Sequence, residues 1–520
     1  MNRNLNLEKI AELPDQWDVI IIGGGATGLG AAVDSASRGF KTLLLEQSDF
    51  AKGTSSRSTK LIHGGLRYLQ QGNLSLVIEA LRERGLLCQN APHLVHPLPF
   101  LVPNYKWWEG PFYGIGVKVY DFLAGSLGLK ASSKLSLEQT KKKLPTLEQE
   151  GLRGGVIYYD GQFDDARLAI TLARTSNDLG ATLFNYMQVT SFIKHQGHCV
   201  GVKAKDLLSQ KEYTLKGKVV INATGAFTDS VRHLDDPKSM SIIAPSQGTH
   251  LVLPKEFLPC DTALLIPHTE DNRVLFFVPW HDKVLLGTTD IEVSQVKLEP
   301  KAQKKEIAFL LKHAANYLTK APTASDVLSV FTGIRPLVRA NENSSTSQLS
   351  RDHRIIVSKS GLITIAGGKW TTYRQMAEDV INKAIQVSSL PDHPCITRTL
   401  HLQGFCKHAD PKDPWSVYGS DRKVLEALVK KEGKELNEPI HPNLPYKQVE
   451  VIFAIRKEMA RTVEDILSRR SRSLLLDAQA SIEAAPLIAE ILAKELNHSA
   501  HWQKQQVKSY RELAQGYLPL

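Results

Sequence analysis

The clearest hydrophobic pattern lies near the start of the chain. The residues at 18–22, DVIII, have the character of a short buried strand, and a second strand pattern, KTLLLE, stands at 41–46. Between them come the glycine turn GGGATG at 23–28 and a run of small residues at 29–40 that predicts a helix. A strand, glycine turn, helix and strand within about 30 residues predict the beginning of a parallel, doubly wound sheet.

The same kind of pattern returns twice further along. EYTLKGKVVINATG at 212–225 is typical of a strand, a turn and a buried strand that ends in a loop of small residues. After Gly361, LITIAGGKWTTYRQMAEDVINKAI again predicts a strand, a glycine turn and a helix. We expect both segments to belong to the first sheet.

The intervening stretches have other patterns. Residues 74–90 predict a helix, and several short β-patterned segments recur from residue 245 onward. A helical span near 302–318 precedes FTGIRPLV at 331–338, which we interpret as a loop, and the last part of the chain, notably 447–495, is helical in pattern. These segments predict an inserted, mixed and largely antiparallel sheet, followed by a helical region.

A chain of 520 residues with 42% hydrophobic content is too long for one compact core, so two or three domains are expected. The fold class is α/β, or α+β overall. The predicted units are residues 1–75, 150–240 and 350–390 for a discontinuous, doubly wound Rossmann-like domain, 76–149 and 241–349 for an inserted mixed-sheet domain, and 391–520 for a C-terminal helical domain.

Composition narrows the classes of partner. Sixty-four Lys and Arg against 54 Asp and Glu give a formal charge of +10, which suits phosphorylated metabolites, acidic lipid or nucleic acid. Basic residues are not interleaved with aromatics, so no nucleic-acid partner is expected. The five cysteines stand far apart without a Cys-x-x-Cys pair, which predicts a reducing compartment and no metal site.

The sequence shows no targeting or membrane-spanning pattern. The first residues lack the apolar run of a signal peptide, and they contain acids, which argues against a transit peptide. No stretch reaches the roughly 18 consecutive apolar residues of a transmembrane helix. We therefore expect any membrane contact to be peripheral and monotopic.

The glycine turn carries the signature of a dinucleotide site. Gly23 permits a tight turn, Gly25 lets the backbone approach a pyrophosphate, and Gly28 lets the helix pack closely on the strand. Glu46, at the end of the next strand, is placed to accept hydrogen bonds from a ribose. FAD fits better than NAD because no separate nicotinamide domain follows. The loop TSSRSTKLIHGGLRYL at 54–69 can wrap a flavin diphosphate, with Ser58 as a candidate contact.

The sequence resembles the FAD-dependent, quinone-linked glycerol-3-phosphate dehydrogenases over nearly the whole chain. Several long motifs in the right order carry this resemblance. They are GGGATGLGAA at 23–32, STKLIHGGLRYL at 58–69, INATGAFTD at 221–229, GTHLVL at 248–253, VPW at 278–280, GTTD at 287–290, TGIRPLV at 332–338, GGKWTTYRQMAED at 367–379 and MARTVEDILSRRSR at 459–472.

The resemblance implies further contacts with FAD. Thr224 and Gly225 would lie near its adenosine and pyrophosphate part. Gly367, Gly368 and Thr371 would lie against the ribityl chain and the flavin ring, at another helix N-terminus. Each segment taken singly has an alternative interpretation as a loop that closes a sheet.

The resemblance also implies a pocket for glycerol 3-phosphate. Arg67, Tyr68 and Lys369 would bind the substrate, and arginine suits a phosphate because its planar fork stays protonated. His250 is the first candidate base for the C2 hydroxyl, and Arg335 would hold the substrate and stabilise negative charge on its oxygen. An arginine beside the alcohol remains the alternative group for the proton.

The implied electron acceptor is ubiquinone or a similar quinone, and the expected location is the cytoplasmic face of a bacterial inner membrane. Residues 105–130 are the candidate docking segment because apolar side chains recur there at helical spacing after two tryptophans. A core helix of the inserted domain is an equal alternative. Arg469, Arg470 and Arg472 are expected on a solvated helix face, with contact to acidic lipid as the alternative. A homodimer is a further possible assembly, since the sequence does not determine the oligomeric state.

Two alternative functions are also considered. An oxidase of the same fold would use oxygen on glycerol 3-phosphate or on an amine, and the phosphate-suited arginines disfavour the amine. A flavin-binding scaffold or redox sensor would bind FAD without turnover, and the full set of polar pocket residues disfavours it.

Overall fold

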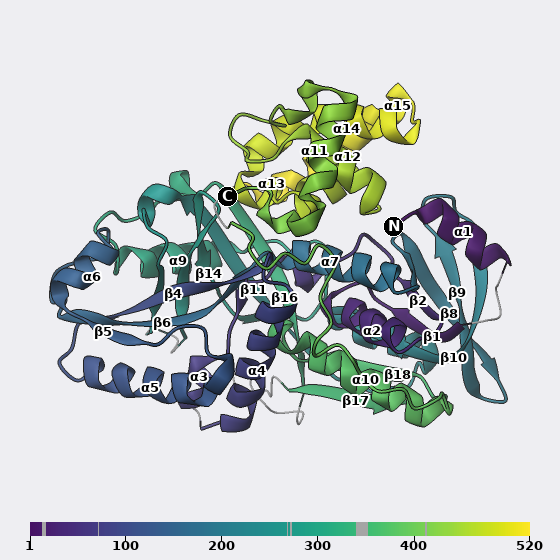
Figure 1. The fold of residues 1–520 in the computed structure, drawn as a ribbon, viewed down its shortest axis with the longest axis horizontal. Helices are drawn as coiled ribbons and strands as arrows, with labels where there is room; N and C mark the ends of the chain where they lie inside the picture. Colours follow the sequence, from purple (N-terminus) through teal and green to yellow (C-terminus); the bar gives the residue numbers. More distant parts are fainter. Residues whose placement is uncertain are drawn as a thin grey trace.

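The structure, a computed structural model, describes residues 1–520 except 13–16, 71, 268, 271–272, 340–351, 411–412 and 520, and only the backbone of Arg67 and Gln70. Two sheets lie side by side, and a domain of helices sits above them (Figure 1). The α/β class and the C-terminal helical domain predicted from the sequence are confirmed.

The first sheet has the strand order β17-β18-β10-β1-β2-β7. Its strands pair in parallel except at β17, which is antiparallel to β18, as expected for a doubly wound domain. A hairpin of β8 and β9 extends from β10. The bounds are β1 (Trp17–Ile22), β2 (Thr42–Leu45), β7 (Thr182–Phe184), β8 (Met187–His195), β9 (His198–Asp206), β10 (Glu212–Asn222), β17 (His353–Val357) and β18 (Ile363–Gly367).

Strand β1 is buried on both faces because the sheet is covered on both. Val19 and Ile21 pack in one core with the helices α2 (Ala26–Ser37), α7 (Asp165–Asp178) and α10 (Tyr373–Ser388). Ile20 and Ile22 pack in another core with residues of the β8–β9 hairpin. This double burial explains why the strand is an unbroken apolar run.

The second sheet is mixed and largely antiparallel, as predicted, with the order β15-β11-β14-β13-β12-β4-β6-β3. Strand β16 pairs with β11, and β5 pairs with β6. The bounds are β3 (Leu61–Ile62), β4 (Val95–Asn104), β5 (Ser133–Leu135), β6 (Gly154–Phe163), β11 (Ile243–Pro254), β12 (Ala263–Ile266), β13 (Leu275–Trp280), β14 (Lys283–Gly287), β15 (Ile291–Glu292) and β16 (Ser329–Val338).

Two sequence-based expectations differ from this sheet. Residues 331–338 belong to strand β16 and not to a loop; Pro336 is tolerated because β16 pairs only with β11 among the described strands. Strand β6 lies in the second sheet, and so does β3, which pairs with it, although residues 150–240 and 1–75 are expected in the first unit. Its ladder with β4 runs along its whole length, which fixes it there.

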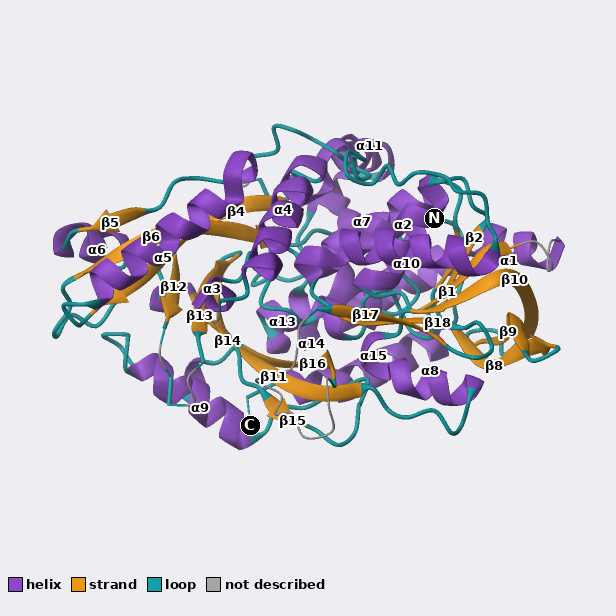
Figure 2. Ribbon diagram, turned by 90° about the horizontal axis from the view of Figure 1, so that it is seen from below, coloured by secondary structure: helices purple, strands orange, loops and turns teal. Residues whose placement is uncertain are grey.

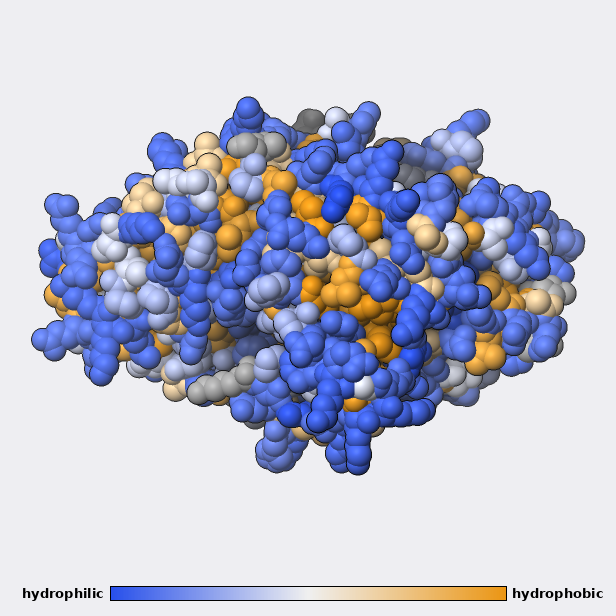
Figure 3. Space-filling model, turned by 90° about the horizontal axis from the view of Figure 1, so that it is seen from above, coloured by the Kyte–Doolittle hydropathy of each residue, from blue (hydrophilic) through white to orange (hydrophobic). Residues whose placement is uncertain are grey.

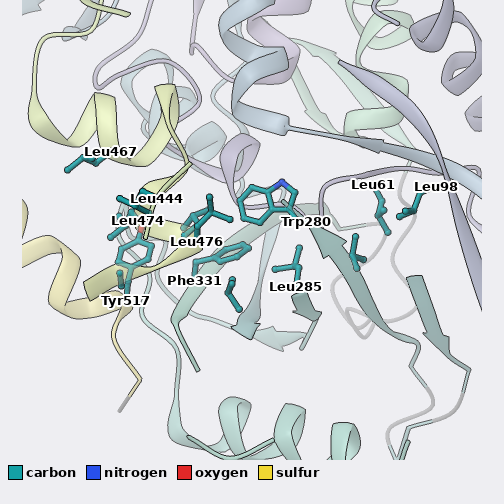
Figure 4. Packing of buried hydrophobic residues seen from close by; sticks show 14 of the residues in the cluster. Leu61, Leu98, Trp280, Leu285, Phe331, Leu444, Leu467, Leu474, Leu476 and Tyr517 are labelled. Atoms are coloured by element: carbon teal, nitrogen blue, oxygen red, sulfur yellow. The ribbon is translucent and has the colours of Figure 1, made fainter. Parts of the chain in front are cut away.

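The C-terminal domain packs on the second sheet through apolar side chains. Its elements are α11 (Arg422–Glu432), α12 (Gln448–Lys457), a π-helix at Asp465–Arg470, α13 (Ser473–Leu476), α14 (Ala478–Leu496) and α15 (Ala500–Ala514). Leu474, Leu476 and Tyr517 share a buried cluster with Trp280 and Phe331 of the second sheet (Figure 4). Seen from above, on the side where this domain lies, the outer surface of the molecule is mostly hydrophilic (Figure 3).

Helix α5 (Glu109–Ala124) lies across the second sheet on the side shown in Figure 2. Its inner face buries Tyr113 and Tyr120, whereas Ile115 is 67% exposed and Phe122 is 84% exposed. The buried face agrees with the interpretation of residues 105–130 as a core helix. The exposed apolar face is the one on which the docking interpretation depends, and docking remains a prediction. Among the described helices, none is long and apolar enough to cross a membrane. The remaining helices are α1 (Arg3–Glu12), α3 (Leu66–Gln70), α4 (Leu74–Asn90), α6 (Leu137–Lys143), α8 (Thr228–Asp235) and α9 (Lys304–Ala315).

Candidate active site

The turn between β1 and α2 requires glycine for reasons of space. Gly23 has a φ of 108°, and a Cβ there would lie 2.7 Å from the carbonyl oxygen of Ala223. A Cβ on Gly28 would lie 1.9 Å from the carbonyl oxygen of Gly23. Gly25 is the N-cap of α2. The turn therefore presses closely on the sheet, and it leaves the N-terminus of α2 at the edge of a cavity.

This first cavity has a volume of about 450 Å³, and it runs along the carboxyl ends of the parallel strands. Ligands of doubly wound sheets bind at this edge. The predicted cofactor contacts in its wall are Gly23, Gly25, Glu46, Thr224, Gly225, Gly367 and Gly368. Gly28 does not line the cavity. It lies behind the turn, where it lets helix α2 pack closely against the backbone of Gly23. The glycine turn, a helix N-terminus and the half-buried carboxylate of Glu46 fit an adenine dinucleotide.

Glu46 reaches the cavity from the end of β2. Its carboxylate accepts hydrogen bonds from the backbone N–H of Gly24, at 2.7 Å, and of Ser48, at 2.8 Å. These bonds hold the carboxylate beside the glycine turn, and burial raises its pKa. Its oxygens have further lone pairs with which to accept ribose hydroxyls.

A second cavity of about 310 Å³ adjoins the first, and the two share Thr54, Arg335, Lys369 and Trp370 in their walls. The structure thus brings four of the five predicted substrate contacts together, while the side chain of Arg67 lies outside the described part of the chain. The predicted residues in this wall are Ser58, Tyr68, His250, Arg335, Lys369 and Thr371.

His250 is held in the wall from three sides. A hydrogen bond of 2.9 Å joins its Nε2 to the hydroxyl of Thr59, and its ring stacks on Phe331 with centroids 4.8 Å apart. A Cβ on Gly287 would lie 2.1 Å from its Cδ2, so glycine makes room for the ring. Burial, followed by the charges of Lys60 and Arg335, lowers the pKa of His250 well below its ordinary value. The imidazole is therefore neutral near pH 7 and able to accept a proton.

Arg335 extends from β16 to the boundary of the two cavities. Its guanidinium donates to the Thr288 hydroxyl at 3.1 Å and to the Thr289 carbonyl at 3.0 Å, and it lies 3.6 Å from the Asp290 carboxylate. A Cβ on Gly248 would lie 2.4 Å from its Nη2. These contacts fix the cation at the cavity wall, where its field attracts an anion.

Lys369 and Tyr68 lie against each other in the second cavity. The Nζ of Lys369 is 3.9 Å from the centroid of the Tyr68 ring, a cation–π contact. Gly65 permits this position of the ring, because a Cβ there would lie 2.3 Å from Tyr68. Thr371 exchanges hydrogen bonds of 3.3 Å with the backbone of His63. Two cations, Lys369 and Arg335, thus border the space between the cavities.

Residues 18–374 match the family described as FAD dependent oxidoreductase, and residues 363–506 match the C-terminal domain of alpha-glycerophosphate oxidase. The mitochondrial glycerol-3-phosphate dehydrogenase of Macaca fascicularis is 42% identical over 96% of this chain and 73% of its own length. That of Arabidopsis thaliana is 37% identical over 98% of this chain and 87% of its own length. The chain belongs to the FAD-dependent glycerol-3-phosphate dehydrogenases.

A solved structure agrees with this family. The glycerol-3-phosphate dehydrogenase from Bacillus halodurans, solved with FAD, aligns with a TM-score of 0.82 and 28% identity over 100% of this chain and 98% of its own. The alpha-glycerophosphate oxidase from Mycoplasma pneumoniae has a TM-score of 0.56 at 18% identity over 74% of this chain and 98% of its own, a likeness of fold alone. FAD is therefore the cofactor of this dehydrogenase.

Some residues of this glycerol-3-phosphate dehydrogenase lie elsewhere than predicted. Ser58 donates from its hydroxyl to Asp165 at 2.6 Å and borders the second cavity, away from the glycine turn. Arg469, Arg470 and Arg472 are buried, which corrects their placement on a solvated face or against lipid. Their guanidinium groups form ion pairs with buried carboxylates. A basic run therefore does not identify a solvated surface in this dehydrogenase.

The dehydrogenase also uses polar residues that the sequence pattern did not single out. Ser55 accepts a hydrogen bond from the backbone N–H of Ala26 at 2.9 Å, at the start of α2. Thr59 orients His250. The density of hydroxyls in TSSRST at 54–59 was the available signal. Among the described residues, no group of three or more His, Cys, Asp or Glu is arranged to hold a metal ion.

Proposed function

We propose that this enzyme oxidises sn-glycerol 3-phosphate at C2 to dihydroxyacetone phosphate and passes the electrons to a membrane quinone. The observation that carries the proposal is the junction of the two cavities. The cavity with the dinucleotide glycine turn opens directly onto a pocket that combines two cations with a neutral histidine. A phosphorylated alcohol matches both features.

In the proposed mechanism, the glycine turn, the N-terminus of α2, Glu46 and the Gly367–Gly368 turn hold FAD. Bound FAD supplies the hydride acceptor. Its redox chemistry belongs to the cofactor, while the protein orients the substrate and manages charge. Trp370 lines both cavities, and its indole donates to the carbonyl oxygen of Ser55 at 2.9 Å, which ties the cofactor loop to the substrate pocket.

The substrate is held by cations and deprotonated by histidine. Lys369 and Arg335, together with Arg67, bind the phosphate and the reacting oxygen, and Tyr68 forms a wall. His250 accepts the C2 hydroxyl proton as hydride leaves that carbon. The lowered pKa of His250 keeps it unprotonated before substrate binds. An incoming phosphate offsets the positive charges of Lys60 and Arg335 and makes the imidazolium less costly.

Helix α5 supports the choice of a lipid-soluble acceptor. Tyr113, on its inner face, lines the second cavity, whereas Phe112, Ile115 and Phe122 on the same helix are exposed. A helix that packs one apolar face inside and exposes aromatic and aliphatic side chains on another suits the headgroup region of a bilayer. The proposed location is the cytoplasmic face of a bacterial inner membrane, and the five cysteines, all within the described chain, are free, in keeping with a reducing compartment.

Stopped-flow absorbance under anaerobic conditions tests the function. Glycerol 3-phosphate is expected to bleach the bound flavin, and glycerol, which has no phosphate, is expected to leave it oxidised. Absence of bleaching by the phosphorylated substrate would instead identify a flavin-binding scaffold.

The second half of the reaction is tested on the reduced enzyme. A soluble ubiquinone analogue is expected to reoxidise the flavin at least as fast as the enzyme turns over. Oxygen from air alone is expected to reoxidise it far more slowly. Rapid reoxidation by oxygen with stoichiometric peroxide would make the protein an oxidase and contradict the quinone proposal.

A further inference from the structure

The loop after β2 forms one wall of the FAD cavity. Glu46, Gln47 and Ala51 line the cavity, and the backbone N–H of Ala51 donates to the carbonyl oxygen of Gly24 at 2.9 Å. The shape of residues 46–51 therefore determines where the Glu46 carboxylate and the glycine turn stand relative to each other. The loop has no regular secondary structure of its own, so contacts from outside must hold it.

Asp49 anchors this loop to the C-terminal domain. It is fully buried and does not line the cavity. Its carboxylate accepts hydrogen bonds from Arg469 Nε at 2.6 Å and from Arg470 Nη1 and Nη2 at 2.6 and 2.9 Å. Burial raises the pKa of Asp49, but the charges of Arg470 and Arg469 outweigh burial, so the pKa lies below its ordinary value. The anchor is therefore an ionised carboxylate held by two guanidinium groups.

A second contact of the π-helix at residues 465–470 reaches the segment of the cavity wall that adjoins this loop. The hydroxyl of Tyr186 donates to Asp465 at 2.6 Å, while the backbone N–H of Tyr186 donates to the carbonyl oxygen of Ser48 at 2.7 Å. Met187, the next residue, lines the FAD cavity and donates to the carbonyl oxygen of Glu46 at 2.7 Å. Two neighbouring segments of the cavity wall are thus joined to each other and to residues 465–470.

The third contact lies at the far end of the loop. Lys52, which lines the FAD cavity, pairs with Glu464 at 2.9 Å. Glu464 in turn pairs with Arg469 at 2.8 Å. Arg469 also pairs with Asp465 at 2.9 Å. The groups that reach Asp49, Tyr186 and Lys52 therefore form one connected network, and its C-terminal members all lie at residues 464–470.

We propose that the C-terminal domain is a positioning element of the FAD site. Arg469 and Arg470 hold residues 46–51 in the conformation that binds FAD, although neither residue lines the cavity. This inference rests on the assignment of the first cavity to FAD but not on the choice of substrate or electron acceptor. It predicts that FAD affinity depends on side chains of the C-terminal domain that never touch the cofactor.

The test uses the full-length enzyme freed of flavin and titrated with FAD, with quenching of flavin fluorescence as the readout. The variant Asp49→Asn is expected to weaken FAD binding at least about tenfold, because a neutral amide no longer pairs with the two arginines. At saturating FAD, its KM for glycerol 3-phosphate is expected to stay within about twofold of the parent, because residues 46–51 do not line the second cavity.

The matched control is Asp421→Asn. Asp421 pairs with Arg174 at 2.6 Å, so it also joins the C-terminal region to the FAD domain, but Arg174 lies on α7 and does not line the FAD cavity. The control is expected to change FAD affinity by less than about twofold. Equal loss of FAD affinity in both variants would overturn the proposal, because it would show that the network only joins domains.

A milder variant covers the case in which Asp49→Asn does not fold. Tyr186→Phe removes one hydroxyl and keeps the ring, and it is expected to weaken FAD binding about threefold. A folded Asp49→Asn protein, verified by circular dichroism, with parental FAD affinity would overturn the proposal. If Asp49→Asn is unfolded, parental FAD affinity in Tyr186→Phe would overturn it.

Discussion

The hydroxyl of Thr59 lies 2.9 Å from Nε2 of His250, and this bond sets the orientation of the imidazole in the substrate pocket. The other ring nitrogen, Nδ1, is buried, with no hydrogen-bond partner among the described residues. Stacking on Phe331 restrains the plane of the ring but not its rotation within that plane. Thr59 is therefore the polar contact that selects one edge of the ring.

Thr59→Val is expected to slow flavin reduction by glycerol 3-phosphate about fivefold, because a lost hydrogen bond of about 1 kcal/mol frees the ring to rotate. Thr59→Ser, which keeps the hydroxyl, serves as the matched control and should stay within about twofold. Stopped-flow absorbance of the flavin measures both. A parental rate in Thr59→Val contradicts the assigned role of the bond.

Gly287→Ala is expected to reduce the rate of flavin reduction by about a hundredfold while FAD affinity remains parental. The new Cβ would stand 2.1 Å from Cδ2 of His250, so the ring must leave its position in the wall. Gly116→Ala, where a Cβ meets nothing within 4 Å, controls for the substitution itself. Normal reduction in Gly287→Ala would mean that the position of His250 does not matter for the reaction.

Phe122→Asp is expected to lower binding to vesicles of anionic phospholipid at least about fivefold, because it places a charge on the exposed face of α5. The control is Leu208→Asp, since Leu208 is also exposed but lies in the turn after β9. Cosedimentation measures the bound fraction. Equal binding by the parent and Phe122→Asp would remove α5 as the docking surface.

His93 is expected to make the fold sensitive to acid. Burial lowers the pKa of His93 from 6.5 to about 4, so below pH 6.5 the unfolded chain takes up a proton that the folded chain refuses. Stability is therefore lost as pH falls from 6.5 toward 4, by up to about 1.4 kcal/mol per pH unit.

His93→Gln should lose less stability than the parent between about pH 7.5 and about pH 5. The midpoint of guanidinium unfolding measures the difference at each pH. His408→Gln, at an exposed histidine, should follow the parent. Parallel pH profiles of the parent and His93→Gln would refute the assignment.

The parts of the fold that could be predicted have signals that are local in sequence. Gly23, Gly25, Gly28 and Glu46 belong to one strand, turn, helix and strand, and the physical need for each residue can be stated from that unit alone. The strand at residues 331–338 is harder to predict from the sequence. Glycine and proline favour a loop, and the strand exists only because β11 pairs with it along its whole length.

The buried arginines could not be placed from sequence at all. Asp49, the partner of Arg469, is 420 residues away, and a basic run on a helix is usually solvated. Thr59 was missed for a similar reason, since its contact with His250 spans 191 residues. The interpretation of residues 105–130 stayed open because the helix has two apolar faces, one packed inside and one exposed.

The long separation between Asp49 and Arg470 has a consequence for biosynthesis. A ribosome completes the glycine turn, β2 and Asp49 early, yet the two guanidinium groups emerge more than 400 residues later. Until then the nascent chain cannot pair the aspartate with these two arginines, so we expect the first domain to reach its final form only after they emerge. If these arginines position the loop as proposed, flavin loading is expected to be a late step of biosynthesis, and a chain that ends before residue 469 is expected to lack a competent flavin site.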